Sequence, residues 1–186
     1  MLELNFEPFP VLETNRLVLR QITIEDANEI FELRSNAEAM KYIGRPKPKV
    51  VEDVHELIAN MNELTARIQW GVTLTSENKV IGTIGYHVID KQHYRAEIGY
   101  MLHPDYWRSG IMSEALIATV NFGFEKIGLY SIEARIAPEN IASAKILEKN
   151  GFIKEGHLKE SFFYDDRFSD TGIYSMLKSV WANNRL

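Results

Sequence analysis

The stretch AEIGYMLHPDYWRSGIMSE, residues 96–114, decides how this chain folds. Its first seven residues are mostly apolar and are followed by His103 and Pro104, which predicts a short buried strand. From Met112 onward, apolar side chains recur three or four residues apart, which predicts a helix with one face on a core. Those positions are Met112, Leu116, Val120, Phe124 and Ile127. The loop between strand and helix contains Gly110, and the first N–H groups of a helix have no acceptors within it. We therefore expect this loop to bind a phosphate or pyrophosphate.

The loop carries neither common nucleotide-binding pattern, because GxxxxGK[ST] and GxGxxG are both absent from the sequence. On its own it is equally compatible with an ordinary strand-to-helix turn, since short glycine loops are weak signals. Residues 107–112, WRSGIM, resemble the loop with which Gcn5-related N-acetyltransferases (GNAT) bind the pyrophosphate of coenzyme A. The family pattern is Q/R-x-x-G-x-G/A, and only Gly110 matches it. Trp107 and Met112 replace the usual residues, whereas residues 113–116 are similar to the ribosomal-protein-alanine (Rim-type) branch.

Two further segments carry this resemblance. Residues 13–20, ETNRLVLR, alternate charged and aliphatic side chains, which predicts a first strand, and they resemble the E-T-x-R-L-x-L-R opening of the Rim-type branch. Residues 140–152, NIASAKILEKNGF, predict a helix with Asn140 as its N-cap and Gly151 just beyond its end. This segment resembles the family pattern N-x-x-[AS]…E-K-x-G-F and is the most specific match in the chain. The resemblance extends over residues 13–177.

Composition limits the class of protein. The chain has 186 residues, 45% hydrophobic and 25% charged, and we expect one domain over residues 1–186 with its core at about 13–177. The absence of cysteine excludes disulfides and thiol nucleophiles, and the five histidines show no metal-ligand spacing. We see no signal peptide and no apolar run long enough to span a membrane. A net charge of −5 argues against a nucleic-acid surface. We expect a cytoplasmic protein without a metal.

The other segments complete an α/β pattern. A capping-box signature at Thr23 begins a predicted helix whose core face includes Ile30 and Arg34. A second helix is predicted over residues 51–68. Further strands are predicted over residues 69–75, 80–89, 130–137, 153–160 and 172–177.

The sequence allows two interpretations for each of two predicted loops. The proline-rich residues 45–49 are either a solvated linker or a mobile flap near an acceptor site, because the prolines bar regular structure. Asp165, Asp166 and Asp170 surround Arg167, and they form either a solvated hairpin loop or an acidic collar for a cationic substrate.

The resemblance implies an α/β GNAT fold, in which a mixed, mostly antiparallel sheet carries helices on both faces. In this family the strands at residues 97–103 and 131–137 splay apart, and the pantetheine arm of acetyl-CoA lies between them like an added strand. The implied reaction is transfer of an acetyl group from the thioester to an amine. The residues implied for coenzyme binding are Met101, Leu102, His103, Trp107, Arg108, Ser109, Gly110, Ile111, Met112, Ser113, Asn140 and Ser143.

Acetyl transfer sets three chemical requirements. The amine must lose a proton, the developing oxyanion needs hydrogen-bond donors, and the leaving thiolate needs a proton or strong stabilisation. Glu97 is the candidate base, directly or through water, although a salt-bridged surface carboxylate is an equally open interpretation. Many family members place the acid, a tyrosine, where this chain has Leu147. In the Rim-type branch a serine on this helix serves, and Ser143 matches it; its alternative role is helix capping.

The amine that accepts the acetyl group is the feature that the sequence determines least. The Rim-type resemblance implies the N-terminal α-amino group of a ribosomal protein. An α-amino group has a pKa near 8, against about 10.4 for lysine, so a carboxylate base deprotonates it more readily at neutral pH. Two alternatives stay open, which are a polyamine or amino-sugar acetyltransferase and a coenzyme-binding module without catalysis. A homo-oligomer is compatible with the sequence, and we expect no contact with nucleic acid or membrane.

Overall fold

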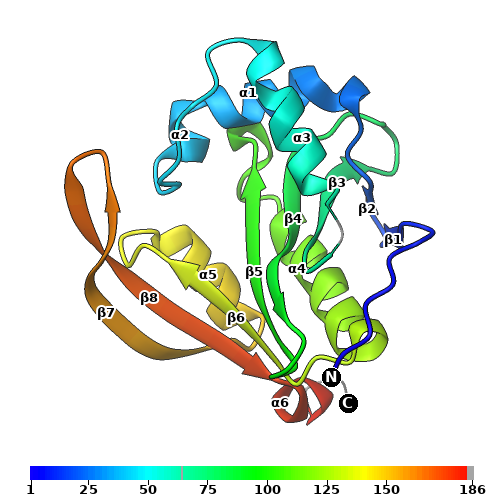
Figure 1. The fold of residues 1–186 in the computed structure, drawn as a ribbon, viewed down its shortest axis with the longest axis vertical. Coiled ribbons are helices and arrows are strands. Elements are labelled where there is room, and N and C mark those ends of the chain that lie inside the picture. The colour runs from blue at the N-terminus through cyan, green and yellow to red at the C-terminus, as the bar shows by residue number, and fades with distance from the viewer. Residues whose placement is uncertain (64, 184–186) are drawn as a thin grey trace.

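One eight-stranded sheet runs through the molecule in the order β1-β2-β3-β4-β5-β6-β8-β7. The computed structural model describes residues 1–63 and 65–183. All neighbouring strands are antiparallel except β5 and β6, which are parallel. The predicted α/β fold with a mixed, mostly antiparallel sheet is therefore confirmed. Figure 1 shows β5 near the middle of the molecule and the long β7–β8 hairpin beside β6.

The elements have the following bounds. The strands are β1 Leu12–Glu13, β2 Leu17–Arg20, β3 Ile68–Leu74, β4 Gly82–Asp90, β5 Arg95–Leu102, β6 Ser131–Ile136, β7 Ile153–Tyr164 and β8 Arg167–Leu177. The α-helices are α1 Ala27–Ser35, α2 Ala37–Met40, α3 His55–Met61, α4 Ile111–Phe122, α5 Ile141–Lys149 and α6 Lys178–Asn183. Short 3-10 turns are η1 Ile24–Asp26, η2 Val51–Val54 and η3 Pro104–Tyr106, and η4 Gly123–Ile127 is a π-helical turn.

Helices cover both faces of the sheet, as predicted. Helices α4 and α5 pack on one face, where Leu116, Leu147 and Ile98 belong to one apolar core. On the other face α1 and α3 share a smaller cluster around Ile30, and α1 and α2 contact Met101 of β5. Ile98 and Met101 lie on opposite faces because successive side chains of a strand alternate. Strand β5 is thus covered from both sides (Figure 1).

The central helix follows its predicted pattern. All five apolar positions from Met112 to Ile127 are buried. The last turn changes to π geometry at Gly123, where the hydroxyl of Tyr86 donates a hydrogen bond of 2.8 Å to the carbonyl of Thr119. A side chain on Gly123 would collide with that hydroxyl. The strand β4 thus shapes the end of the helix that packs on it.

Strands β5 and β6 diverge after a short pairing. They pair only through Arg95 with Ser131, Ala96 with Ile132, and Glu97 with Glu133. Beyond Glu97, β5 continues to Leu102 in register with β4 alone, while β6 continues along β8. The backbone of residues 98–102 therefore has an edge that no neighbouring strand of the described chain occupies, which is the predicted splay.

Two predicted elements have different boundaries in the structure. Residues 13–20 form two short strands joined by a turn, in which the N–H of Thr14 donates to the carbonyl of Leu17, rather than one strand. The helix predicted over residues 51–68 ends at Met61, because Ile68 is needed in β3, where it is fully buried opposite Tyr86. Leu64, which belonged to that prediction, lies outside the described residues.

The two ambiguous loops have definite conformations. Residues 45–49 have no regular secondary structure. The closing strands are longer than predicted, and Asp165 and Asp166 form the tip of their hairpin with positive φ angles of 52° and 55°. Asp170 lies away from that tip and binds His157 at 2.5 Å. The hairpin interpretation is therefore the one observed. Within the part of the chain that the structure describes, no helix is long and apolar enough to cross a membrane.

Candidate active site

A strand, a glycine loop and a helix N-terminus meet at the end of β5. The loop begins with η3 and ends at Gly110, the N-cap of α4, whose φ is 79°. Arg108 also has a positive φ, of 60°, so the chain reverses sharply just before the helix. The first N–H groups of α4 have no acceptors within the helix, and its dipole favours an anion at this end. An open glycine N-cap and unpaired N–H groups fit the pyrophosphate of coenzyme A.

The loop is held in place by the start of the chain. Glu114, in the first turn of α4, accepts hydrogen bonds from the Thr14 hydroxyl at 2.6 Å and from the N–H of Arg16 at 3.0 Å. The Arg16 guanidinium contacts the same carboxylate at 2.7 Å and donates to the carbonyl of Ser109 at 2.9 Å. Burial acts to raise the pKa of Glu114, but these hydrogen bonds outweigh it and lower the pKa. The E-T-x-R opening thus fixes the position of the glycine loop.

Side chains within the loop also make internal contacts. The indole N–H of Trp107 donates to the carbonyl of Leu102 at 2.8 Å, and the Ser109 hydroxyl donates to the carbonyl of Tyr106 at 2.5 Å. Ser113 exchanges hydrogen bonds with the amide of Asn150, which joins the start of α4 to the end of α5. The carbonyl of Leu102 and the hydroxyl of Ser113 therefore already have protein partners.

Glu97 lies where the two strands part. Its carboxylate is half-buried, and the nearest cation is Arg135 on β6, with Nε 3.5 Å from Oε2. Burial raises the pKa of Glu97, the positive charge of Arg135 lowers it, and the balance is a raised pKa. A carboxylate with a raised pKa is more basic than an exposed glutamate. Arg135 also binds Glu133 at 2.9 Å, so the arginine is shared between two carboxylates.

On the opposite face of β5, a partly buried tyrosine pairs with a buried serine. The hydroxyl of Tyr100 lies 2.7 Å from the hydroxyl of Ser143 on α5. The N–H of Ser143 donates to the side chain of Asn140, the predicted N-cap, at 3.1 Å. Burial raises the pKa of Tyr100 to about 12, although the hydrogen bond with Ser143 acts in the other direction. The phenol is therefore protonated throughout the physiological pH range.

The predicted site residues fall into three groups. The loop and the start of α4 contain Trp107, Arg108, Ser109, Gly110, Ile111, Met112 and Ser113, while Met101, Leu102 and His103 end β5, and Asn140 and Ser143 begin α5. Ile111 and Met112 are buried in the core, so only their backbone faces the loop, and the Met101 side chain is likewise buried. His103 lies beside the loop, with Nδ1 3.6 Å from Asp105.

Sequence reasoning missed several contributors. Tyr100 is not among the predicted site residues, and nothing local in the sequence links it to a serine 43 residues away. Arg16 and Glu114 are separated by 98 residues, and the E-T-x-R resemblance was the one available signal for their contact.

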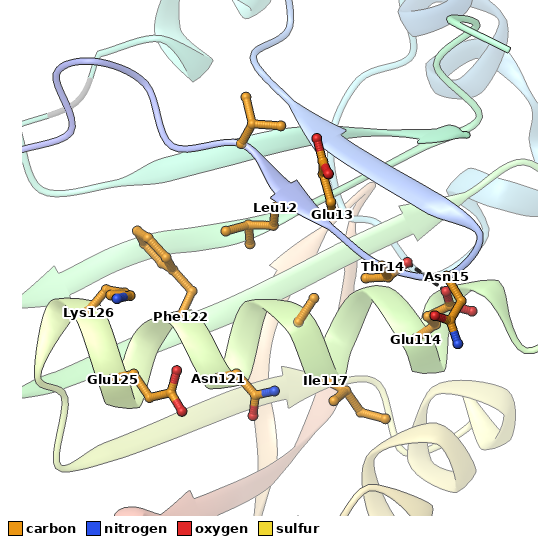
Figure 2. A pocket seen from close by; sticks show the side chains of 12 residues that line it. Leu12, Glu13, Thr14, Asn15, Glu114, Ile117, Asn121, Phe122, Glu125 and Lys126 are labelled. Atoms are coloured by element: carbon orange, nitrogen blue, oxygen red, sulfur yellow. Dashed lines mark hydrogen bonds between the residues drawn. The ribbon is translucent and has the colours of Figure 1, made fainter. Parts of the chain in front are cut away.

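A hollow on the surface lies away from these residues. It separates β1 from the outer surface of α4, and Figure 2 shows Leu12 and Phe122 in its middle and Glu114 with Thr14 at one end. None of Glu97, Tyr100 and Ser143 lines it. Among the described residues, no group of three His, Cys, Asp or Glu side chains could hold a metal ion.

Comparison with known proteins agrees with this geometry. The family described as "Acetyltransferase (GNAT) domain" matches residues 16–153. The uncharacterized N-acetyltransferase YoaA of Bacillus subtilis is 40% identical over 173 residues, which cover 91% of this chain and 98% of YoaA. A GNAT-family acetyltransferase structure from Bacillus anthracis superposes with a TM-score of 0.82 at 29% identity, covering 91% of this chain and 99% of the other.

Two relatives with named substrates differ in what they acetylate. The ribosomal-protein-serine acetyltransferase of Escherichia coli is 32% identical over 101 residues, 54% of this chain and 56% of its own length. The spermidine N-acetyltransferase of Vibrio cholerae, solved in complex with CoA and spermine, has a TM-score of 0.81 and 25% identity, covering 91% of this chain and 100% of the other. The splayed strands, the glycine loop and these similarities together establish that the chain is an acetyl-CoA-dependent member of the GNAT N-acetyltransferase family.

Proposed function

We propose that this protein transfers the acetyl group of acetyl-CoA to an α-amino group, at the N-terminus of a protein. The observation that carries the proposal is the arrangement around the free edge of β5. Glu97 lies on one face of that strand, and the Tyr100–Ser143 pair lies on the other. A base and a proton donor are thus separated by the width of a strand, which suits a reaction that takes a proton from one group and gives one to another.

Each residue has a defined task in this proposal. Glu97, directly or through one water, accepts the proton of the attacking amine. Backbone N–H groups on the open edge of β5, at its end near residues 101 and 102, donate to the acetyl oxygen as negative charge develops on it. The N–H of His103 already donates to the carbonyl of Ile81 at 2.9 Å. The amine nitrogen bonds to the acetyl carbon, the carbon–sulfur bond breaks, and Tyr100 supplies the proton of the released thiol through Ser143.

The Tyr100–Ser143 pair resolves a difficulty of the sequence. A serine hydroxyl alone is a poor acid, and the usual family tyrosine is replaced by Leu147, which is fully buried. In this proposal Tyr100 supplies a phenol from β5, beside Ser143, instead of from the helix. Ser143 is hydrogen-bonded to that phenol. When the Ser143 hydroxyl donates its proton to the thiolate, it can therefore receive another proton from Tyr100.

The choice of an α-amino acceptor rests on two considerations. Residues 13–20 and 140–152 resemble the Rim-type branch, and the ribosomal-protein-serine acetyltransferase of Escherichia coli is among the relatives. In addition, a glutamate base removes a proton more readily from an amine with a pKa near 8 than from lysine. A ribosomal protein is therefore the proposed class of acceptor.

Similarity to spermidine acetyltransferases favours a second candidate, a polyamine. The test compares release of free thiol from acetyl-CoA with three acceptors: peptides that begin with free Ala or Ser, the same peptides blocked at the N-terminus but carrying lysine, and spermidine. We expect the free N-terminus peptides to have the highest kcat/KM. Preference for spermidine would replace the proposal by the polyamine alternative, and coenzyme binding without thiol release would indicate a module that has lost catalysis.

A further inference from the structure

A buried arginine without a partner lies on the Glu97 face of the sheet. Arg34, near the end of α1, is only 8% exposed, and its Nε atom is buried without any hydrogen-bond partner. Within residues 1–63 and 65–183, no carboxylate forms an ion pair with it. Removing a positive charge from water is costly unless an anion or hydrogen-bond acceptor compensates for it. A bound anion or hydrogen-bond acceptor would therefore stabilise the Arg34 guanidinium, for which the described residues provide no such group.

Two further arginines add positive charge at the same place. Arg34, Arg45 and Arg67 all lie close enough to His87 to lower its pKa, and together with burial, the larger effect, they bring that pKa to about 4. Burial and the charge of Arg45 also lower the pKa of Arg34 to about 10. Like charges repel, and no described acidic residue forms an ion pair with any of the three. In a chain of net charge −5, this gathering of cations needs an explanation.

The cluster lies beside the candidate base. The ring of His87 occupies the space where a side chain on Gly99 would be. Gly99 and Glu97 lie on the same face of β5, two residues or about 7 Å apart along the strand. The charge of Arg45 also acts on the pKa of Glu97. Leu33, next to Arg34, packs against Met101 at the far end of the same strand face. Arg45 therefore lies near Glu97, and Arg34 and Arg67 lie near His87, whose ring packs on the same face of β5 at Gly99.

The β7–β8 hairpin closes the outer side of this region. A side chain on Gly44, the neighbour of Arg45, would collide with the ring of Phe162 near the hairpin tip. The irregular loop that carries Arg45 is thus packed against the hairpin.

We propose that Arg34, Arg45 and Arg67 form an anion subsite beside Glu97, and that this subsite binds a carboxylate of the acceptor close to its α-amino group. The inference rests on the proposed acetyl transfer, because it assigns one part of the acceptor in that reaction. A guanidinium binds a carboxylate through two parallel hydrogen bonds, so one acceptor carboxylate can satisfy the buried Nε of Arg34. The same charges repel the additional ammonium groups of a polyamine.

The carboxylate can come from two sources, an acidic side chain next to the N-terminal residue or the C-terminus of a very short peptide. One pair of acceptors is Ala-Glu-Ala-amide and Ala-Gln-Ala-amide, which differ by one charge at nearly constant shape. The other pair is Ala-Ala with a free C-terminus and Ala-Ala-amide. We measure kcat/KM for acetyl transfer, and separately the binding of each peptide to the CoA-loaded protein by calorimetry.

For at least one pair we expect the carboxylate form to have a roughly tenfold higher kcat/KM, through a lower KM and tighter calorimetric binding. Arg34→Met should reduce the carboxylate form to the level of its uncharged partner. Arg45→Gln and Arg67→Gln lie at exposed positions, and each should reduce the same preference even if Arg34→Met does not fold. Lys126→Gln removes a positive charge at the end of α4 and should leave the preference unchanged.

Two failures are distinguishable. Equal kcat/KM and equal binding within both pairs, or arginine variants that keep the preference, would overturn the anion subsite while thiol release still supports acetyl transfer. If no amine releases thiol, the proposed function is wrong. In that case tighter calorimetric binding of the carboxylate peptides, lost in Arg34→Met, would still support the subsite.

Discussion

The two faces of β5 differ in how they are built. On the α4–α5 face, the side chains that support the coenzyme loop are hydrogen-bonded within the protein: Glu114 with Thr14 and Arg16, Ser113 with Asn150, and Tyr100 with Ser143. On the α1–α3 face, Glu97 shares Arg135 with Glu133, and the Nε of Arg34 has no hydrogen-bond partner among the described residues.

This difference indicates on which face the side chains are held in place by hydrogen bonds within the protein. A coenzyme common to a whole family can bind a preformed loop whose supporting side chains are already hydrogen-bonded within the protein. An acceptor supplies its own charges, so the groups that recognise it are left without partners until it binds. The following predictions test this contrast, beginning with the largest expected effect.

The first prediction concerns the preformed loop. Gly110→Asp should abolish coenzyme binding, because Gly110 has a φ of 79° and the change adds negative charge where the pyrophosphate would lie. Saturating CoA at a hundred times Kd should stabilise the wild type by about 2.7 kcal/mol, which a thermal shift detects. Gly156→Asp, at a position on β7 with ordinary contacts, should keep that shift. A wild-type shift in Gly110→Asp would mean that the coenzyme binds elsewhere.

The second prediction concerns the other face. Glu97→Gln should lower kcat by roughly two to four orders of magnitude, the usual range for a general base, with little change in coenzyme affinity. The exposed Glu139→Gln is the control and should behave as the wild type. Retention of a near-wild-type rate between pH 6 and 9 would assign the base to another group.

The raised pKa of Glu97 also predicts how Glu97→Gln changes the thermal stability of the protein. A carboxylate whose folded pKa exceeds its unfolded value contributes stability at low pH, and that contribution is lost as pH rises through the folded pKa. At neutral pH the buried charge is therefore a net cost, and Glu97→Gln should leave the melting temperature unchanged or slightly raised. In the wild type, kcat/KM should fall as pH drops and Glu97 becomes protonated. A marked loss of melting temperature would show that the Arg135 contact is structural.

The third prediction concerns the proton donor. Tyr100→Phe should lower kcat roughly tenfold, less than the usual effect of a general acid, because a thiolate with a pKa near 8.5 is a good leaving group. Ser143→Ala should have a similar effect, and the double variant should be no slower than the stronger single one if both act as a unit. The exposed Tyr130→Phe is the control. Strictly multiplicative effects would argue against a shared role.

The smallest expected effect concerns the clamp on the loop. Glu114→Gln weakens the contacts to Thr14 and Arg16, and it should weaken coenzyme binding about fivefold, the equivalent of one hydrogen bond. Glu125→Gln, at the far end of the same helix surface in Figure 2, should leave coenzyme affinity unchanged. Equal affinities for both variants would mean that the loop needs no support from the N-terminal segment.

The sequence by itself determined the parts of the site that are continuous in the chain. The run at residues 96–114 predicted the strand, the turn at Gly110 and the core face of α4, and residues 140–152 predicted a capped helix, with Asn140 as N-cap and Gly151 at a φ of 87°. These features depend on hydrophobic periodicity and on caps, which act over a few residues. The helix over residues 51–68 was too long because that periodicity does not reveal that Ile68 is required as a buried neighbour of Tyr86 in the sheet.

Only the tertiary structure decided which distant residues meet. The pairing of Tyr100 with Ser143, the clamp of Arg16 on Glu114 and the gathering of Arg34, Arg45 and Arg67 around His87 join elements that local patterns treat separately. Their positions follow from strand register and from the packing of helices on the two faces of one sheet. Register is set by cross-strand pairing along the whole sheet, so it places a side chain only once every neighbouring strand is in position.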